Sequence, residues 1–503
     1  MEHKYLKIIR GNETAEIAVR DEETLLAAIR RSGYEIEAAC GGNGTCGQCK
    51  VIADGTEVLA CKTLCADVRE VKIPDDSGKG RVQVDVVELD VSQEYEEGTN
   101  VVKLGLAVDI GTTTVAAYLY DLTTGRCLDS KGAMNEQRSY GADVISRISH
   151  ASTQTGIDEL CNTVRKQITD LARQMCRTAH TDGHQNGAAL EDIAYISIAG
   201  NTVMEHLFAG LDPTGIGVAP FTPVSLFGTE EPASKYLDWA APSCKLYICP
   251  CVAGYVGGDI TAGIVSSGAA YEEEQVLFID IGTNGEMAVG NKDGFICCAT
   301  AAGPAFEGAQ IECGSAAKDG AISRVEEDLT FSVIGDVPAA SICGSGLIDA
   351  VAAFLKNEVI DETGFMEDEE YHFTDDVYLS GQDIRQVQLA KAAIRAGAET
   401  LLEKSGKSYE DIGKVIIAGG FGAFLRIKSA CAIGMLPPDL ENKIIYAGNT
   451  AGKGASMALI EKGRKEIEKL DSICTYEELS SSPEFNGHYI EGMMFDEWEQ
   501  VMN

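Results

Sequence analysis

The stretch Leu106-Ala107-Val108-Asp109-Ile110-Gly111-Thr112-Thr113-Thr114-Val115 decides the fold of the larger part of this 503-residue chain. Its apolar run predicts a buried strand that ends near an aspartate, turns at glycine and threonine, and returns as a second strand. The same order recurs 171 positions later in Leu277-Phe278-Ile279-Asp280-Ile281-Gly282-Thr283-Asn284-Gly285-Glu286. A repeat at this spacing predicts two related halves that face each other.

Each turn offers the groups that bind phosphate. Backbone N–H groups of a tight turn and threonine hydroxyls can cradle phosphate oxygens, and a carboxylate at the strand end can hold Mg²⁺ through water or orient an attacking water. One such turn alone would indicate only a tight β-turn, whereas two copies indicate a phosphate site. The expected phosphate ligands are Gly111, Thr112, Thr113, Gly282, Thr283 and Asn284, and the expected catalytic carboxylates are Asp109 and Asp280.

A cysteine-rich loop near the N-terminus is the second motif. It reads Ala39-Cys40-Gly41-Gly42-Asn43-Gly44-Thr45-Cys46-Gly47-Gln48-Cys49, and Cys61 follows. Glycines let a backbone fold tightly around an inorganic cluster, and four thiolates suffice for a [2Fe-2S] centre. Cys40, Cys46, Cys49 and Cys61 are therefore the expected ligands, with Cys65 as the nearby rival for the fourth place. A structural zinc site is the alternative, although zinc sites usually present two separated C-x2-C pairs.

The residues around this loop show strand and helix patterns. Apolar and polar residues alternate over 5–10 and 15–20, a helical pattern covers 22–32, and further strands are predicted near 50–52 and 68–73. Two strands, a helix and further strands around a cysteine loop resemble a β-grasp ferredoxin. The chain is therefore expected to carry single electrons.

Composition limits the cellular setting and the partners. Hydrophobic residues make up 45% of the chain and charged residues 24%, as is ordinary for a globular protein. No stretch approaches the ~20 apolar residues of a membrane span, and the N-terminus lacks an apolar signal core, so a cytoplasmic location away from membranes is expected. The net charge of −37 includes no basic stretch that could bind a polyanion, so nucleic acid is not expected as a partner.

Beyond the repeat, the chain resembles the acetate and sugar kinase, Hsp70 and actin superfamily, whose two halves clasp ATP between them. The stretch Val415-Ile416-Ile417-Ala418-Gly419-Gly420-Phe421-Gly422 is similar to the adenosine motif of that superfamily. The resemblance implies that Gly419, Gly420 and Gly422 border the adenosine. It also implies that residues 449–455 and 198–204 form the two connecting elements at which the halves hinge.

Four further motifs narrow the resemblance to the reductive activators of corrinoid proteins. They are Val256-Gly257-Gly258-Asp259, Ala301-Ala302-Gly303-Pro304-Ala305-Phe306-Glu307-Gly308, Cys343-Gly344-Ser345-Gly346-Leu347-Ile348-Asp349 and Gln388-Leu389-Ala390-Lys391-Ala392-Ala393-Ile394. That family joins an N-terminal [2Fe-2S] ferredoxin domain to an ATP-binding domain of this superfamily. The resemblance implies ATP-dependent transfer of one electron from the [2Fe-2S] cluster to the Co(II) centre of a corrinoid protein, which regenerates Co(I) for methyl transfer.

The implied fold is α/β, with a β-grasp ferredoxin domain, a linker and a duplicated, actin-like (RNase H-like) two-lobed ATP-binding domain. The expected ranges are 1–75 for the ferredoxin-type domain, 76–103 for a linker with a strand-like part at 82–91, 104–473 for the ATPase domain with lobes of roughly 104–270 and 271–473, and 474–503 for a C-terminal tail. The implied cofactors are a [2Fe-2S] cluster, ATP and Mg²⁺. The implied partners are a corrinoid protein of a methyltransferase system and an unidentified electron donor, and a homodimer is one candidate assembly.

Three alternative functions remain open on the residues. A small-molecule kinase uses the same nucleotide domain but leaves the ferredoxin domain unexplained. An ATP-driven activator of a radical dehydratase is close in mechanism but resembles a dimer that shares one [4Fe-4S] cluster. A redox-sensing protein that binds a client with ATP is the third.

Two sets of residues outside these motifs have competing interpretations. Glu307 follows a glycine-proline loop and could contact nucleotide or partner, although a structural hydrogen-bonding role is favoured. Cys249 and Cys251, with Cys297 and Cys298, could form a second metal site, but cysteine is also a common small buried residue and the spacing favours that reading.

Overall fold

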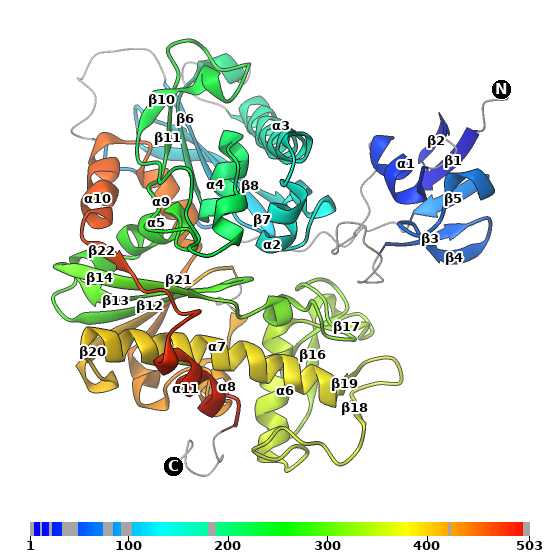
Figure 1. Cartoon of the computed structure of the whole chain (residues 1–503), viewed down its shortest axis with the longest axis vertical. Helices are drawn as coiled ribbons and strands as arrows, with labels where there is room; N and C mark the ends of the chain where they lie inside the picture. Colours follow the sequence, from blue (N-terminus) through cyan, green and yellow to red (C-terminus); the bar gives the residue numbers. More distant parts are fainter. Residues whose placement is uncertain are drawn as a thin grey trace. The chain divides into compact units, whose positions relative to one another are not determined.

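The computed structural model describes residues 5–10, 13–19, 23–32, 49–73, 84–91, 103–179, 188–420 and 424–495. The chain forms two compact units. The first comprises residues 1–79, 134–167 and 206–224, and the second comprises residues 80–133, 168–205 and 225–503. Figure 1 labels the helices and strands of both.

The N-terminal part of the first unit is a five-stranded sheet in the order β2-β1-β5-β3-β4 (Figure 1). Its strands are β1 (Tyr5–Arg10), β2 (Glu13–Ala18), β3 (Lys50–Ala53), β4 (Thr56–Leu59) and β5 (Glu70–Ile73), and its helix is α1 (Leu25–Arg31). β1 pairs antiparallel with β2 and parallel with β5. Leu6 and Ile8 of β1 share a buried core with Leu25 and Ile29 of α1, because alternate residues of a strand face the same side. This arrangement confirms the predicted β-grasp fold.

The second unit contains two six-stranded sheets, and their strand orders are β10-β11-β9-β6-β7-β8 and β21-β20-β12-β13-β14-β22. The first has strands β6 (Leu104–Ile110), β7 (Thr114–Asp121), β8 (Arg126–Met134), β9 (Ile193–Gly200), β10 (Glu230–Pro232) and β11 (Lys245–Ile248). The second has β12 (Gln275–Ile281), β13 (Gly285–Asn291), β14 (Gly294–Thr300), β20 (Ile412–Ala418), β21 (Ile444–Gly448) and β22 (Cys474–Tyr476).

The two sheets repeat the same pairing around the predicted hairpins. β6 pairs antiparallel with β7 and parallel with β9, and β12 pairs antiparallel with β13 and parallel with β20. Asp109 lies opposite Ala199 of the parallel neighbour, and Asp280 lies opposite Ala418 in the same way. The predicted duplication is therefore confirmed, and it places the two aspartates at equivalent positions.

Helices α5 (Gly258–Ser266) and α9 (Thr450–Met457) lie side by side between these two sheets (Figure 1). Small residues allow this close approach, since a Cβ atom added at Gly454 would lie 2.3 Å from the carbonyl oxygen of Ala262. The Ser266 hydroxyl also donates to the carbonyl of Thr450 at 2.6 Å. These two helices connect the halves.

The expectation that residues 198–204 form a connecting element is therefore wrong. These residues end β9 and begin α4 (Thr202–Ala209). Their sequence Ile198-Ala199-Gly200-Asn201 is the counterpart in the first sheet of Ile417-Ala418-Gly419-Gly420 at the end of β20. The duplication of the fold thus explains why Gly200 and Gly419 occupy equivalent positions.

The other helices and two small sheets complete the fold. The remaining helices are α2 (Val144–His150), α3 (Gln154–Thr178), α6 (Gly344–Lys356), α7 (Gly381–Ser405), α8 (Ile427–Ala432), α10 (Glu461–Asp471) and α11 (Pro483–Glu491). The small sheets contain β15 (Ala321–Val325), β16 (Phe331–Val333) and β17 (Ser341–Ile342), and β18 (Glu370–His372) with β19 (Tyr378–Ser380). β22 pairs with β14 and α11 packs against α7, so part of the segment expected as a tail belongs to the second half.

Residues 84–91 of the expected linker form neither a helix nor a strand. Leu89 is buried against the core of the second unit, and its N–H donates to the carbonyl of Gly125 at 3.0 Å. The Tyr120 hydroxyl donates to the carbonyl of Val87 at 2.7 Å. The strand expected at 82–91 is therefore not formed by these residues, and this part of the linker is held on the second unit instead of acting as a free tether.

Within the described ranges, no helix is both long enough and apolar enough to span a bilayer.

Candidate ATP site and cluster cysteines

The two hairpin turns bring their threonines together in the second unit. The Thr113 and Thr283 hydroxyl oxygens lie 3.1 Å apart. Both hydroxyls also donate to the carboxylate of Glu307, at 3.1 Å from Thr113 and 2.9 Å from Thr283. The hydrogen-bonding role expected of Glu307 thus joins the two halves at the turns where phosphate is expected.

Thr112 is held from the neighbouring parallel strand. Its hydroxyl oxygen accepts a hydrogen bond of 3.0 Å from the side-chain amide of Asn201, which follows β9. The side-chain oxygen of Asn201 in turn accepts from the N–H of Met204 at 3.0 Å and so caps the start of α4. Asn201 therefore positions the first turn, a role that the sequence analysis did not assign to it.

Asp109 is held from the connecting helix. The side-chain amide of Asn449 donates to the carboxylate of Asp109 at 2.8 Å. The Asn449 side-chain oxygen accepts from the N–H of Gly452 at 2.8 Å, which caps α9. The backbone N–H of Asn449 donates to the carboxylate of Asp85 at 2.6 Å. A chain of contacts thus runs from the linker through the start of α9 to the first hairpin.

Four buried carboxyl groups on the two hairpins and at the start of α5 have raised pKa values. Burial is the main cause in each case. The charges of neighbouring carboxylates add to it for Asp280, Asp259 and Glu286, whereas the hydrogen bond from Asn449 lowers the pKa of Asp109. The pKa of Asp109 rises to about 6. The pKa of Asp280 rises to about 7, with Asp109 as its charged neighbour. The pKa of Asp259 rises to about 8, with Asp280 and Asp109 as its charged neighbours. The pKa of Glu286 lies well above its usual range, because burial is reinforced by the charges of Asp259 and Asp280.

Asp259 lies in the first turn of α5 and was not among the expected catalytic residues. The signal in the sequence was the motif Val256-Gly257-Gly258-Asp259. A Cβ atom added at Gly257 would lie 2.5 Å from the carbonyl oxygen of Gly200, so only glycine lets α5 start this close to the end of β9. That close approach brings Asp259 to the aspartates of both hairpins.

This group of carboxylates fits a magnesium ion that is shared with a nucleotide. Carboxylate oxygen is the ligand that Mg²⁺ prefers, and a cation would favour the ionised form of these buried carboxyl groups. Among the described residues, no three His, Cys, Asp or Glu side chains form a ready-made metal site. Mg²⁺ usually binds one or two carboxylates together with waters and substrate phosphates, so phosphate oxygens would complete the ligand set.

The predicted adenosine motif lies against the second hairpin. Gly419 has φ of +92°, and a Cβ atom added there would lie 2.6 Å from the carbonyl oxygen of Ile281 and 2.7 Å from the carboxylate of Asp280. Gly420 has open space at the equivalent position. Gly419 is therefore required for the close approach of β20 to the hairpin, and Gly420 leaves room beside it. Gly422 lies outside the described residues.

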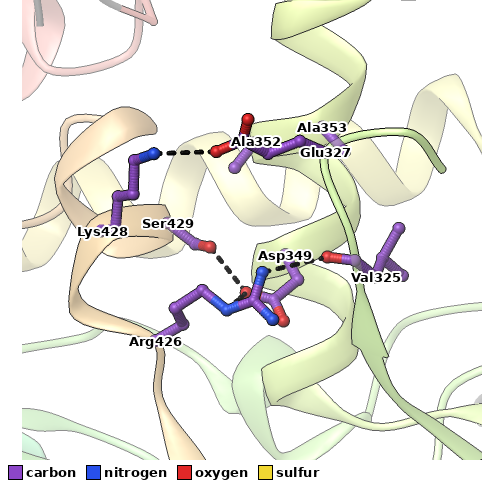
Figure 2. A pocket seen from close by; sticks show the side chains of 8 residues that line it. All are labelled: Val325, Glu327, Asp349, Ala352, Ala353, Arg426, Lys428 and Ser429. Atoms are coloured by element: carbon purple, nitrogen blue, oxygen red, sulfur yellow. Dashed lines mark hydrogen bonds and ion pairs between the residues drawn. The ribbon is translucent and has the colours of Figure 1, made fainter. Parts of the chain in front are cut away.

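A small pocket lies between α6 and the segment that follows the adenosine motif (Figure 2). The buried carboxylate of Asp349 accepts from the Ser429 hydroxyl at 2.6 Å and lies 3.8 Å from the guanidinium of Arg426. Lys428 pairs with Glu327 at 2.8 Å on the opposite side. Most of the side chains that line this small pocket are charged or polar.

The described cluster cysteines lie next to each other in the first unit. The backbone N–H of Cys61 donates to the sulfur of Cys49 at 3.5 Å. Such N–H bonds to sulfur are typical of cluster ligands. Cys65, the rival of Cys61, is fully buried, and burial raises the pKa of its thiol to about 11. Cys40 and Cys46 lie outside the described residues.

The second metal site considered at Cys249 and Cys251 does not form among the described residues, where no group of three metal-binding side chains occurs. Both thiols are buried beside Glu205, and Cys251 donates to its carboxylate at 2.9 Å. Burial raises the pKa of both thiols well above the usual range, with the charge of Glu205 as the second cause. Neutral thiols in such surroundings pack as small apolar residues.

Comparisons with known proteins agree with this architecture. The family described as "2Fe-2S iron-sulfur cluster binding domain" matches residues 8–72, "RACo middle region" matches residues 104–271, and "C-terminal domain of RACo the ASKHA domain" matches residues 274–502. The corrinoid activation enzyme RamQ of Eubacterium limosum is 34% identical over 429 residues, which cover 78% of this chain and 70% of the relative.

Two further proteins are similar over most of the chain. The [Co(II) methylated amine-specific corrinoid protein] reductase of Methanosarcina barkeri is 26% identical over 446 residues, or 79% of each chain. The solved structure of a reductive activator for corrinoid, iron-sulfur protein is 31% identical with a TM-score of 0.69, and the match covers 97% of this chain and 98% of that one.

The fold and its site define a two-lobed ATP-binding domain of the ASKHA class joined to a [2Fe-2S] ferredoxin-type domain. The chain belongs to the family of reductive activators of corrinoid proteins. The family predicted from the sequence motifs is thereby confirmed.

Proposed function

We propose that this protein uses ATP to drive one electron from a [2Fe-2S] cluster to the Co(II) centre of a corrinoid protein and so restores Co(I). The observation that carries the proposal is the meeting of Thr113 and Thr283 from two duplicated hairpins, in a chain that also folds as a ferredoxin domain. A small-molecule kinase would need the two hairpins, but it would not need a ferredoxin domain.

The need for ATP follows from redox energetics. Each ~59 mV of unfavourable one-electron potential costs about 1.4 kcal/mol. Returning Co(II) to Co(I) is uphill from ordinary cellular donors, and plant-type clusters lie at about −400 mV, so electron transfer from such a centre needs additional driving force. Nucleotide binding and hydrolysis can supply it by shifting the two halves between closed and open arrangements around α5 and α9.

In this proposal the hairpin turns bind the phosphates of ATP. Gly111, Thr112, Thr113, Gly282, Thr283 and Asn284 offer N–H and side-chain donors, and Gly419, Gly420 and Gly422 border the adenosine. Asp109, Asp280 and Asp259 would hold Mg²⁺ or its waters, and the cation would stabilise charge at the reacting phosphate. Asn449 keeps Asp109 oriented for that role.

The electron would come from a cluster held by Cys40, Cys46, Cys49 and Cys61. The contact between the Cys61 N–H and the Cys49 sulfur supports Cys61 as the fourth ligand. The proposal also divides the chain into a ferredoxin domain at 1–75, a linker at 76–103 and an ATPase domain at 104–473. It further includes a cytoplasmic location and a separate electron donor.

ATP hydrolysis by the purified full chain tests this function. Phosphate release should be stimulated by Co(II) corrinoid proteins from methyltransferase systems of the same organism, and it should leave no phosphorylated small molecule behind. Stimulation by a sugar or carboxylic acid, with transfer of the phosphate to it, would instead identify a kinase.

A further inference from the structure

Glu307 occupies the point where the two phosphate turns meet. One of its carboxylate oxygens accepts from both threonine hydroxyls, at 3.1 Å from Thr113 and 2.9 Å from Thr283. The other accepts from Thr113 at 3.1 Å. A carboxylate thus makes the contacts that an oxygen of a terminal phosphate would make with the same two hydroxyls.

These contacts exclude a phosphate at the same point. A threonine hydroxyl has a single proton, so while it donates to Glu307 it cannot donate to a ligand. A phosphate and a carboxylate at this distance would also repel each other. A nucleotide that reaches both turns must therefore displace Glu307.

The loop around Glu307 favours a side-chain movement. Glu307 ends a short 3₁₀ helix at Pro304–Glu307, flanked by Gly303 and Gly308 with φ of +79° at each. Phe306 is 2% exposed in the core, and a Cβ atom added at Gly308 would lie 2.3 Å from the carbonyl oxygen of Ser315. Because Phe306 and Gly308 fix the backbone on both sides, displacement has to come from rotation of the Glu307 side chain.

We propose that Glu307 determines which ligands occupy the ATP site, because it acts as an internal competitor for the terminal-phosphate position. The proposal rests on the ATP site proposed above and adds a selective element to it. A ligand with Mg²⁺ and a full triphosphate replaces both hydroxyl bonds and adds contacts of its own. An anion that cannot replace both hydroxyl bonds does not displace Glu307. AMP is too short to reach the hairpin turns, so its binding does not require Glu307 to move.

The test is a calorimetric binding measurement on the full-length protein with a non-hydrolysable ATP analogue and Mg²⁺, and separately with AMP. Glu307→Gln keeps the shape of the side chain but removes its charge and one hydrogen-bond acceptor. We expect the affinity for the ATP analogue to rise roughly tenfold. The substitution weakens the hydrogen bonds that Glu307 makes in the free protein, and in the complex these bonds are already broken, so binding costs less. The affinity for AMP should stay within about twofold.

Two variants serve as controls. Glu312→Gln removes a carboxylate from the same loop that accepts from Tyr378 and Ser380, and it should leave both affinities unchanged. Glu307→Asp keeps the charge but is too short to reach both hydroxyls, so the affinity for the ATP analogue should rise less than in Glu307→Gln. Thermal unfolding of each variant shows that it is folded.

An unchanged or lower affinity of Glu307→Gln for the ATP analogue would overturn the proposal, and a lower affinity would instead indicate that Glu307 holds the cation or its water. If the unmodified protein fails to bind the analogue, the assignment of the ATP site is wrong. The competitor role of Glu307, which depends on that site, is then wrong as well. The two failures are therefore distinguishable.

Discussion

The backbone N–H of Asn449 donates a 2.6 Å hydrogen bond to the carboxylate of Asp85, which lies 364 residues earlier in the chain. The side chain of the same Asn449 donates to Asp109 at the first phosphate turn. The segment that leads from the ferredoxin domain is thus fastened at the start of α9, through the same residue whose side chain contacts Asp109. Asn449 therefore connects the linker with the first hairpin.

Removing this contact should destabilise the second unit. Asp85→Ala leaves the Asn449 N–H without its charged acceptor at a helix start, and we expect a loss of about 1–2 kcal/mol in the free energy of unfolding. Asp90→Ala is the matched control, because Asp90 pairs with Lys462 at 3.5 Å on an exposed surface and should cost less than about 0.5 kcal/mol. Urea denaturation measures both. Equal losses of unfolding free energy in the two variants would show that the Asp85 contact stabilises the protein no more than the exposed Asp90–Lys462 ion pair does.

The aspartate of the second hairpin should be essential for the use of ATP. Asp280→Asn removes a carboxylate from the proposed magnesium site, so ATP hydrolysis should fall at least a hundredfold. The visible spectrum of the cluster should not change, because Asp280 belongs to the nucleotide-binding sheet. Asp293→Asn, in an exposed turn of the same sheet, should retain full activity. Normal hydrolysis by Asp280→Asn would remove Asp280 from the mechanism.

The carboxylate group should make the metal-free protein less stable as pH rises. The pKa values of Asp109, Asp280 and Asp259 in the folded state are about 6, 7 and 8, against an ordinary value of 3.8. Between about pH 4 and pH 8 the folded state therefore holds more protons than the unfolded state, and the free energy of unfolding falls as pH increases. Thermal unfolding in EDTA between pH 5 and pH 8 measures this slope.

Asp259→Asn should flatten that slope, because it removes the group whose pKa is raised most among the three aspartates. Mg²⁺ with nucleotide should also flatten it in the unmodified protein, since the cation favours the ionised carboxylates. A slope that is identical in the variant and in the unmodified protein would contradict the assignment of Asp259 to this group.

Cys61 and Cys65 can be separated by single substitutions. Cys61→Ser should reduce the iron content or shift the visible absorption of the anaerobically purified protein, because a thiolate ligand is lost. Cys65→Ser should keep both, because the proposed cluster does not use the Cys65 thiol. The opposite result would make Cys65 the fourth ligand.

The hairpins could be predicted from the sequence because their information is local. A continuous apolar run, an aspartate and a Gly-Thr turn define β6 with β7 and β12 with β13, and the repeat indicates their equivalence. The partners of these turns could not be predicted in the same way. Asn449 contacts Asp109 across 340 residues, and that distance is closed only by the packing of α9 between the sheets.

The linker shows the limit of periodicity more clearly. The apolar residues over 82–91 predict a strand, but Val84, Val87, Leu89 and Val91 pack against the core of the second unit without pairing in a sheet. Alternation indicates that one side of an extended segment is buried, and it does not specify whether the backbone finds a neighbouring strand. The same ambiguity hid the role of Asp85, whose partner belongs to a helix at the other end of the chain.

The most direct test of the central claim is the ATP dependence of cobalt reduction. The full-length protein with its cluster reduced is mixed with a Co(II) corrinoid protein under anaerobic conditions, and the Co(I) absorption is followed with and without ATP and Mg²⁺. The account predicts that Co(I) appears only when ATP and Mg²⁺ are present and that Asp280→Asn abolishes it. Formation of Co(I) at the same rate and to the same extent without ATP would contradict it.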